Sequence, residues 1–256
     1  MHRPARYPAA PTSFIDPALP GTVDFEFSFA FQPIVDASAR KVISFEALVR
    51  GPHGEPASEV FARVPRDDLY CFDQACRLKA IRLAARLNLH ASLNLNFFPN
   101  SVQRSSEYLG ATLEASRQAG FPVERLVFEV TETEYLQYRG SVEGLFDKYA
   151  AYGFQTAIDD FGTGFSGLRR LAEYRPSYIK LDRGLVSDIH EHRVKQVIVR
   201  GIRSICRQLS ITPVAEGVET VEEYRWLRVA GIHIFQGYYF AQPAFEALAE
   251  VKPAVF

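Results

Sequence analysis

Cysteine is scarce in this sequence of 256 residues, and its few positions exclude the usual cysteine chemistry. The three cysteines, Cys71, Cys76 and Cys206, are an odd number and contain no Cys-x-x-Cys pair. They indicate neither a disulfide framework nor a zinc site, and they favour reduced, packed thiols in a cytoplasmic protein. The six histidines are scattered along the chain and suggest no metal cluster either.

Long apolar runs are missing, and so is a large excess of charge of either sign. No run approaches the length of a membrane span, and the N-terminus MHRPARYPAAPTSF lacks the apolar stretch of a signal peptide. The formal net charge is -1, so nothing indicates a protein that binds a nucleic-acid polymer. A small anionic ligand stays compatible, because a site can be locally positive on a neutral protein.

The proline distribution divides the chain into two parts. Residues 1–24 hold five of the fifteen prolines and show no periodicity, so we predict an irregular N-terminal extension there. Residues 25–256 are predicted to form the folded domain, since short β-like runs alternate there with longer amphipathic ones.

Eight β-like runs with helical segments between most of them are typical of a (β/α)8 barrel. The first two runs are separated by too few residues for a parallel crossover, so that pair should be antiparallel. The expected fold class is therefore α/β, a modified TIM barrel that begins with an antiparallel strand pair. The predicted strands are residues 27–34, 41–49, 91–97, 126–132, 154–161, 178–182, 211–217 and 232–237. The predicted helices include residues 78–87, 102–119, 139–152, 192–209 and 220–230.

Polar side chains gather in or at the ends of most of these strands. In a barrel of this class the carboxyl ends of the strands meet at one mouth, where catalytic groups lie. One acid at a strand end is unremarkable, but clustered carboxylates repel one another unless a cation neutralises them. The pattern therefore predicts a metal site. The polar residues in or at the ends of the strands are Glu46, Asn96, Glu129, Glu132, Asp159, Asp160, Lys180, Asp182, Glu216 and Gln236, and the acids and amides among them are the candidate ligands.

The chemistry of these side chains indicates which metal they suit. Their donors are carboxylate and amide oxygens, which favour Mg²⁺ or Mn²⁺ over zinc. Five or six acids are more than one Mg²⁺ uses, since that ion keeps several waters. Two ions that share a bridging aspartate fit the count better, and such pairs serve the hydrolysis of phosphoesters.

The adjacent acids Asp159 and Asp160 pose a geometric problem. Successive side chains of a regular strand point to opposite faces, so both can reach one site only if the strand ends and the chain bends. Gly162 and Gly164 follow at once and supply that freedom. The stretch FGTGFSG is therefore expected to be a loop over the mouth, or else a plain connector to the next helix.

Eight motifs in this order resemble those of EAL-domain cyclic di-GMP phosphodiesterases, over about residues 27–245. They are QPIVD (32–36), FEALVRGP (45–52), LNFFPNSV (95–102), FEVTE (128–132), AIDDFGTGFSGL (157–168), YIKLDR (178–183), PVAEGVET (213–220) and FQGYYFAQP (235–243). The resemblance implies that residues 25–256 are one EAL phosphodiesterase domain. The tripeptide Glu-Ala-Leu alone carries little weight, because a second copy at 246–248 is expected in a C-terminal helix.

The resemblance also implies two Mg²⁺ or Mn²⁺ ions and their ligands. One ion would be held by Glu46, Asn96, Glu129 and Asp159, and Asp159 would bridge to a second ion that Asp160 and Glu216 also serve. Two asparagines compete for the ligand role in LNLNF. Alignment of the proline that follows the motif, Pro99, selects Asn96 over Asn94.

Further roles follow from the resemblance alone. Lys180 is similar to a lysine that polarises the attacking water, and Glu216 and Asp160 would share the catalytic work. Substrate contacts are expected from Gln32, Arg50 and Gln236, although Arg50 could instead form a surface salt bridge. Supporting residues would steady the glycine-rich loop and the lysine. The residues for this role are Glu132 and Glu219, and Asp182 is expected to be a further supporting residue.

The implied reaction is metal-assisted hydrolysis of one 3′–5′ phosphodiester of cyclic di-GMP to linear pGpG. The main alternative is a catalytically inactive module that binds cyclic di-GMP as a receptor, and a weaker one is another phosphoesterase on the same barrel. A homodimer is expected. Because no sensory segment precedes the domain in this sequence, a separate sensory partner chain is possible.

Overall fold

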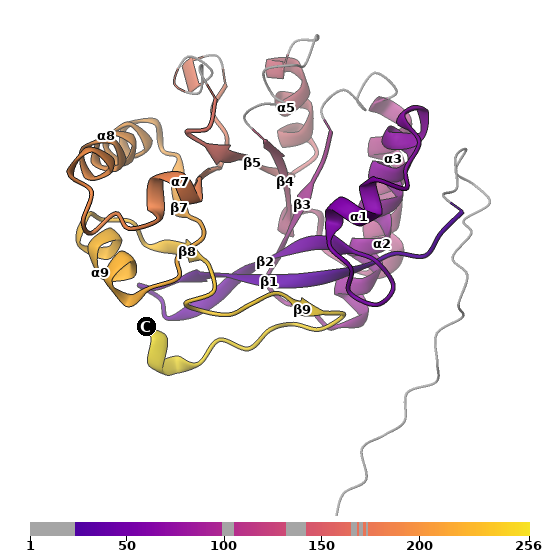
Figure 1. The fold of residues 1–256 in the computed structure, drawn as a ribbon. Coiled ribbons are helices and arrows are strands. Elements are labelled where there is room, and N and C mark those ends of the chain that lie inside the picture. Colours follow the sequence, from indigo (N-terminus) through magenta and orange to yellow (C-terminus); the bar gives the residue numbers. More distant parts are fainter. Residues whose placement is uncertain (1–23, 99–104, 132–141, 165–167, 169–170, 173) are drawn as a thin grey trace, which may run out of the picture.

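The computed structural model describes the chain except residues 1–23, 99–104, 132–141, 165–167, 169–170 and 173 (Figure 1). A closed barrel of eight strands is the centre of the fold, in the order β2-β3-β4-β5-β6-β7-β8-β1, with β1 paired to β2. The strands are β1 (Ser28–Asp36), β2 (Lys41–Arg50), β3 (Ser92–Asn96), β4 (Leu126–Thr131), β5 (Gln155–Phe161), β6 (Tyr178–Leu181), β7 (Thr212–Ala215) and β8 (Ile234–Gln236). All eight correspond to the predicted runs, so the expected fold class is confirmed.

Strand β1 is the irregular element of the barrel. It runs antiparallel to both of its barrel neighbours, β2 and β8, whereas the other barrel pairs are parallel. A tight turn joins β1 to β2, and Arg40 in that turn has a φ of 53°. The antiparallel start follows because so short a connection cannot carry the chain back for a parallel strand.

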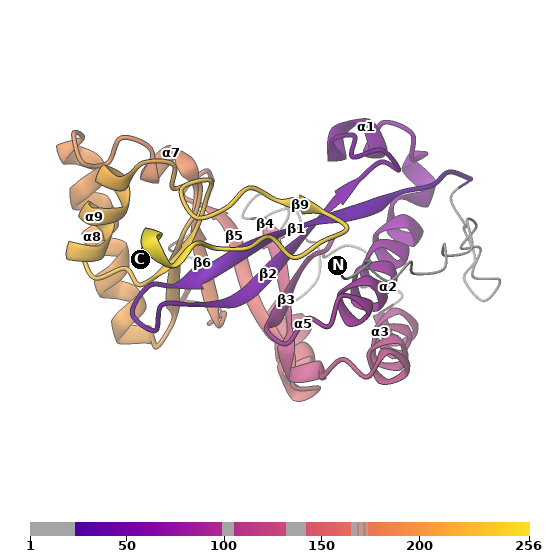
Figure 2. The same cartoon turned by 90° about the horizontal axis from the view of Figure 1, so that it is seen from below.

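Helices surround the barrel on the outside, with α2 and α3 on one side and α8 and α9 on the other (Figures 1 and 2). They are α1 (Ala57–Phe61), α2 (Leu69–Arg86), α3 (Ser105–Ala119), α5 (Val142–Ala151), α7 (Arg183–Val186), α8 (Arg193–Leu209) and α9 (Val221–Val229), with short 3-10 turns η1 (Arg66–Asp68), η3 (Val123–Arg125) and η4 (Pro253–Val255). No helix among the described residues is long and apolar enough to span a membrane.

Helix packing follows the apolar periodicity of the sequence. In α8 the buried residues are Val199, Ile202 and Cys206, which share one face of the helix. They join a cluster around β5 to β8, while a second cluster fills the space between β1 to β4 and the helices α2, α3 and α5. Aromatic rings dominate the second cluster, where the centroid of Phe128 lies 4.9 Å from that of Phe154.

The prediction of a C-terminal helix over the second Glu-Ala-Leu copy is wrong, because residues 246–248 are not helical. Residues Ala244–Phe245 form a ninth strand, β9, antiparallel to β1 with Ala30 opposite Phe245. β8 pairs only with the later part of β1, from Ile34 to Asp36, so the earlier part has a free edge. That edge supplies backbone hydrogen bonds, which a short segment uses in preference to forming an isolated helix. Figure 2 shows this segment running along the β1–β2 pair.

We expect Gly237→Ala to destabilise the fold strongly. A Cβ at Gly237 would lie 2.1 Å from the backbone oxygen of Val218, and the φ of 156° also disfavours a side chain. Backbone atoms can move aside only at a large cost in free energy, so the free energy of unfolding should fall by about 3 kcal/mol or more. Chemical denaturation measures it.

Gly201→Ala is the matched control. Gly201 is exposed within α8, and a Cβ there would meet nothing within 4 Å. Alanine is a better helix former, so this variant should gain about 0.5–1 kcal/mol. Equal stability of the two variants would contradict the packing described at Gly237.

Candidate functional site

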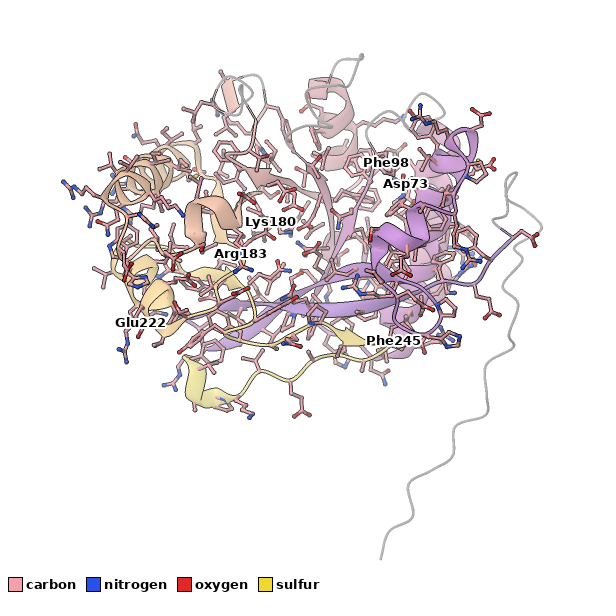
Figure 3. All side chains as sticks on the ribbon, in the orientation of Figure 1. Asp73, Phe98, Lys180, Arg183, Glu222 and Phe245 are labelled. Carbon is pink, nitrogen blue, oxygen red and sulfur yellow. The ribbon has the colours of Figure 1, made fainter. Side chains whose placement is uncertain are left out.

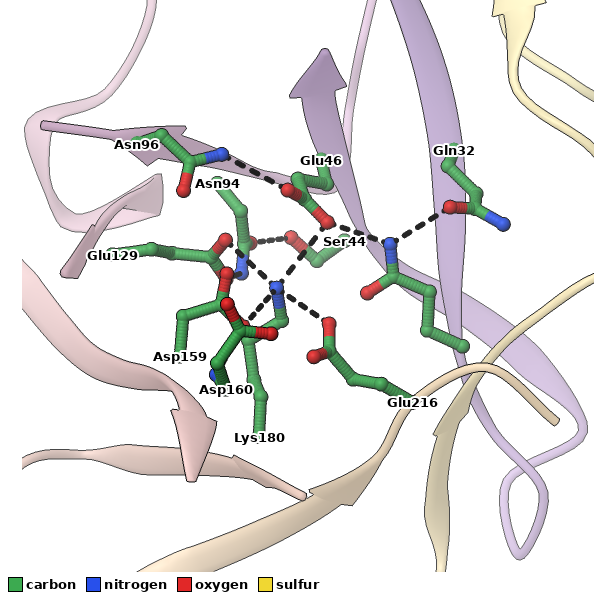
Figure 4. A network of polar contacts seen from close by, with 11 residues as sticks. Gln32, Ser44, Glu46, Asn94, Asn96, Glu129, Asp159, Asp160, Lys180 and Glu216 are labelled. Atoms are coloured by element: carbon green, nitrogen blue, oxygen red, sulfur yellow. Dashed lines mark hydrogen bonds and ion pairs between the residues drawn. The ribbon is translucent and has the colours of Figure 1, made fainter. Parts of the chain in front are cut away.

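The strand registers bring the predicted polar residues together at the carboxyl ends of the strands. Asn96 of β3 lies opposite Glu129 of β4, and Gln32 of β1 lies opposite Glu46 of β2. Because alternate residues of a strand share a face, each of these side chains can point to the barrel interior. Figure 4 shows the acids among them, with Asp159 and Glu216, surrounding one point, while the two amide side chains lie further out.

That point is the ammonium group of Lys180. The side chain is 1% exposed, and its Nζ lies 2.7 Å from Glu216 Oε1 and 2.9 Å from Glu129 Oε2 (Figure 4). It also lies 3.1 Å from Asp159 Oδ1 and 3.2 Å from Glu46 Oε2. One cation thus faces four carboxylates, so the site keeps a strongly negative character even with the lysine in place.

The pKa values of these groups reflect that charge balance. Burial raises the pKa of Glu129 to about 8, and the carboxylates of Glu46 and Asp159 add to the effect, although Lys180 opposes it. Burial would lower the pKa of Lys180, but the carboxylates around it outweigh burial and raise that pKa well above its ordinary value. Burial, with the Asp159 charge beside it, also raises the pKa of Glu216. The single positive charge of Lys180 is therefore too small to neutralise the carboxylates around it.

Two sets of carboxylate oxygens are spaced closely enough to hold a metal ion each. Glu46, Glu129 and Asp159 offer oxygens within 4.8 Å of one another, and so do Asp159, Asp160 and Glu216. Asp159 belongs to both sets. The structure thus brings together the acids that the resemblance implied for two ions, with the shared aspartate between them.

The adjacent acids reach one site through a different bend from the one expected. β5 does not end at Asp159, but its pairing with β6 is irregular between Ile158 and Phe161. Asp160 itself adopts a φ of 52°, and its backbone N–H donates to Asp159 Oδ1 at 3.0 Å. This left-handed residue turns the second side chain inward. The bend therefore precedes Gly162 and does not depend on the glycines alone.

The two competing asparagines lie on the same face at different depths. Asn96 is exposed at the mouth and donates from Nδ2 to Glu46 Oε1 at 2.9 Å. Asn94 is buried, donates to Glu129 Oε1 at 2.6 Å and accepts a hydrogen bond from the hydroxyl of Ser44. Asn94 thus orients a carboxylate from below, and Asn96 is the one that faces the mouth.

A cavity of about 280 Å³ opens above this cluster and is called the acid cavity here. Gln236 donates from Nε2 to Glu46 Oε2 at 2.7 Å and to Gln32 Oε1 at 3.1 Å, so both glutamines lie beside the acids. The lining residues are Gln32, Glu46, Asp159, Asp160, Asp182, Arg183, Glu216, Gly217, Glu219, Gln236, Gly237 and Tyr238.

Two of the expected supporting residues, Glu219 and Asp182, lie among the described residues. Glu219 forms a two-pronged ion pair with Arg183, with 2.7 Å between Oε2 and Nη2, while Lys180 is held by the four acids above. Asp182 caps α7, since its Oδ1 accepts from the backbone N–H of Gly184 at 2.7 Å. Glu132 lies outside the described residues.

A second hollow of about 220 Å³, the apolar cavity, lies beside β2 and β3 and contains Arg50. Asn96 lines it too, and its walls include Phe61 and Phe98. Arg50 donates to the backbone oxygen of Val49 at 2.8 Å, and no carboxylate among the described residues pairs with it. The structure thus places Arg50 beside the acids rather than among them.

Sequence reasoning missed two polar residues of the apolar cavity. Asp73 and Arg77 of α2 are 5% and 2% exposed, and their side chains pair at 3.0 Å. Asp73 Oδ1 also accepts from the backbone N–H of Phe98 at 3.3 Å. The available signal was an acid and a base four residues apart in a mostly apolar helical pattern, but such a pair is also common on exposed helices.

Comparison with known proteins identifies the family. The EAL domain family model matches residues 21–243, nearly the whole described chain. The chain therefore belongs to the EAL domain family.

Curated relatives and solved structures agree with this assignment. The Escherichia coli antirepressor BluF is 30% identical over 87% of this chain and 56% of its own, and the probable cyclic di-GMP phosphodiesterase PdeN is 30% identical over 85% and 43%. The chain thus spans about half the length of these relatives. A standalone EAL protein of Vibrio cholerae with c-di-GMP bound is 43% identical, with a TM-score of 0.85 over 91% of this chain and 99% of its own. Klebsiella pneumoniae BlrP1 with manganese and c-di-GMP is 37% identical, with the same TM-score over 91% and 60%.

We expect Lys180→Met to destabilise the metal-free protein by about 3–5 kcal/mol, because four clustered carboxylates lose their shared cation. In EDTA the melting temperature should fall by about 6–12 °C. Millimolar Mn²⁺ should raise it more in the variant than in the wild type, since the ion replaces the lost charge.

Lys41→Met is the control for this measurement. Lys41 is exposed at the start of β2, so its loss should change neither the melting temperature nor the response to Mn²⁺. A metal-free Lys180 variant as stable as the wild type would show that the lysine does not hold the cluster together.

Proposed function

We propose that this chain is a metal-dependent phosphodiesterase that hydrolyses cyclic di-GMP to linear pGpG. The observation that carries the proposal is the pair of carboxylate sets that share Asp159 at the mouth of the barrel. Relatives named as cyclic di-GMP phosphodiesterases and similar structures with c-di-GMP bound support the choice of substrate. A phosphodiester is also the substrate class on which two-metal sites commonly act.

The residues present fit two hard divalent cations. The candidate ligand atoms are oxygens, which hard cations prefer, and the ion pairs of these acids with Lys180 support a site for positive charge. One Mg²⁺ or Mn²⁺ would be held by Glu46, Asn96, Glu129 and Asp159, and the other by Asp159 with Asp160 and Glu216. When bound, such ions lower the pKa of water and stabilise charge on phosphate oxygens.

The remaining steps belong to the side chains of this chain. Lys180 would donate a hydrogen bond to the attacking water and so orient it beside the phosphate. The water oxygen bonds to phosphorus, the bond from phosphorus to the 3′-oxygen breaks, and that oxygen takes up a proton. Glu216 and Asp160 line the acid cavity and can accept the proton that the water loses.

The apolar cavity suits one guanine base of the substrate. Its aromatic walls, which include Phe61 and Phe98, favour a flat ring, and the carboxylate of Asp73 offers acceptors for the donors on the guanine edge. Arg50 lies in the same cavity and can bind a phosphate through its planar fork. One substrate can therefore place a base in this cavity and a phosphate at the acids.

A receptor that binds cyclic di-GMP without cutting it is the second candidate function. The relative BluF is named as an antirepressor rather than as an enzyme, which favours this alternative. Against it, the two carboxylate sets are complete in this chain. The homodimer, the separate sensory chain and the cytoplasmic location rest on family resemblance and cysteine usage, and they stay predictions.

Glu216→Gln separates the enzyme from the receptor. The change keeps the shape of the side chain but removes the charge that would hold the second ion, so turnover should fall at least about 10²-fold. Binding of cyclic di-GMP should persist, because Gln32, Arg50 and the first carboxylate set are unchanged. A product assay for pGpG and a binding titration, each in Mg²⁺ and Mn²⁺, measure both properties.

Glu222→Gln is the control, since Glu222 is an exposed glutamate of the nearby helix α9. It should leave turnover and binding unchanged. Tight binding by the wild type with no pGpG under either ion would establish the receptor instead of the enzyme. Full wild-type activity after exhaustive EDTA treatment would contradict the metal sites.

Replacement of Arg50 and replacement of Lys180 should change different kinetic constants. Arg50→Ala should mainly raise KM, because its phosphate contact is the same in the ground and transition states. Lys180→Ala should mainly lower kcat, by about 10²-fold or more, as expected for loss of a charge-stabilising donor. Steady-state kinetics on cyclic di-GMP checks this division, and identical kinetic changes in the two variants would contradict it.

A further inference from the structure

A chain of buried hydrogen bonds lies beneath the acids, and two of its members have no role in the proposed reaction. Ser44 of β2 and Asn94 of β3 are 6% and 5% exposed, and Glu129 of β4 is fully buried. The hydroxyl of Ser44 donates to Asn94 Oδ1, and Asn94 Nδ2 donates to Glu129 Oε1 at 2.6 Å (Figure 4). Polar side chains thus link three neighbouring strands of the barrel below the mouth.

The direction of this chain follows from its last member. An ionised carboxylate, the form that binds a cation, only accepts hydrogen bonds, so the amide of Asn94 must turn its nitrogen to Glu129. The amide oxygen then faces Ser44, whose hydroxyl supplies a donor. Because the pair is buried, a rotation of the amide would leave polar groups without partners, which costs free energy. Asn94 is therefore held in one orientation beneath Glu129.

The two oxygens of Glu129 consequently face different groups. Oε1 is tied to Asn94, whereas Oε2 lies 2.9 Å from Lys180 Nζ at the centre of the acid cluster. Figure 3 shows Lys180 near the middle of the molecule. A cation that joins this cluster therefore meets one oxygen of Glu129, and it can take both only if the bond to Asn94 is broken.

The number of free carboxylate oxygens matters because divalent cations differ in how many they take. Ca²⁺ is bound by about six to eight oxygens, and a carboxylate can give it one oxygen or both. Mg²⁺ requires a near-octahedral set of ligands at shorter distances, and Mn²⁺ also suits octahedral oxygen sites. A glutamate limited to one oxygen thus disfavours Ca²⁺ more than it disfavours the two smaller ions.

We propose that Ser44 and Asn94 are positioning residues that make the first carboxylate set, Glu46, Glu129 and Asp159, prefer Mg²⁺ and Mn²⁺ over Ca²⁺. This inference rests on the proposed function, in which that set holds an ion. Asn94 fixes the carboxylate of Glu129, and Ser44 fixes Asn94, so both act through the ligand and not on the ion. Residues that hold a metal ligand in this way commonly control metal affinity.

The test is isothermal titration of the metal-free protein with Mn²⁺ and with Ca²⁺, in the Glu216→Gln background. That background lacks one charge of the second carboxylate set, so the titration reports the first set. Asn94→Ala removes the donor to Glu129 and should weaken Mn²⁺ binding about tenfold or more. Ca²⁺ binding should change less than about threefold, because the released oxygen gives that ion a further ligand. The preference for Mn²⁺ over Ca²⁺ should therefore fall.

Ser44→Ala is a milder second variant, which decides the question if Asn94→Ala does not fold. It leaves the amide in place but removes the donor to its oxygen, so Asn94 is held less firmly. The preference for Mn²⁺ over Ca²⁺ should fall in the same direction, by about two- to threefold, since one member of the chain is kept.

Ser116→Ala is the matched control. Ser116 of α3 is 1% exposed, and its hydroxyl donates to the backbone oxygen of Phe121, away from the residues that line the two cavities. The variant loses a similar buried hydrogen bond and should melt at a lower temperature, as Ser44→Ala should. It should nevertheless bind both ions as the Glu216→Gln parent does.

Two results would overturn this role of Ser44 and Asn94. Equal weakening of Mn²⁺ and Ca²⁺ binding would show that the pair supports the cluster without selecting the ion. Unchanged dissociation constants for both ions would show that the bond from Asn94 does not control Glu129.

Failure of the proposed function has a different result. A wild type that binds Mn²⁺ in preference to Ca²⁺ but forms no pGpG would contradict the reaction and not the role of this pair. A wild type that binds neither ion would contradict the metal sites, on which both proposals depend.

Discussion

The repulsion between clustered carboxylates is the constraint on which the rest of the site depends. Four acids, three from β2, β4 and β5 and one directly after β7, meet within hydrogen-bond distance of one ammonium group, that of Lys180. Like charges at such spacing, buried in a barrel, destabilise the fold unless cations neutralise them or protons bind to some of them. Folding therefore assembles a cluster of acids around Lys180 that could hold metal ions.

The irregular start of the barrel contributes directly to this site. Because β1 is antiparallel, it brings Gln32 opposite Glu46 and places Gln236 of β8 within reach of both. The same arrangement leaves part of the β1 edge free, and β9 pairs with that edge. One departure from the regular barrel thus explains both the pair of glutamines at the mouth and the course of the C-terminal segment.

The two cavities divide the mouth by chemistry. The acid cavity is lined by carboxylates and lies over Lys180, whereas the apolar cavity has aromatic walls with the buried pair Asp73 and Arg77. A ligand that is charged in one part and aromatic in another suits such a surface, because each part is bound without burying an unpaired charge. A cyclic dinucleotide has this character.

The sequence by itself determined the barrel, its antiparallel start and the set of acids at the mouth. Strand and helix periods are local properties, and the carboxyl ends of parallel strands must meet in a closed barrel. The inward turn at Asp160, the depth that separates Asn94 from Asn96, and β9 in place of a helix were decided only by tertiary structure. Each depends on which backbone edge or cavity lies nearby in space. The pairing of Arg183 with Glu219 is of the same kind, since it joins the start of α7 to the segment after β7, 36 residues away, and no local pattern connects them.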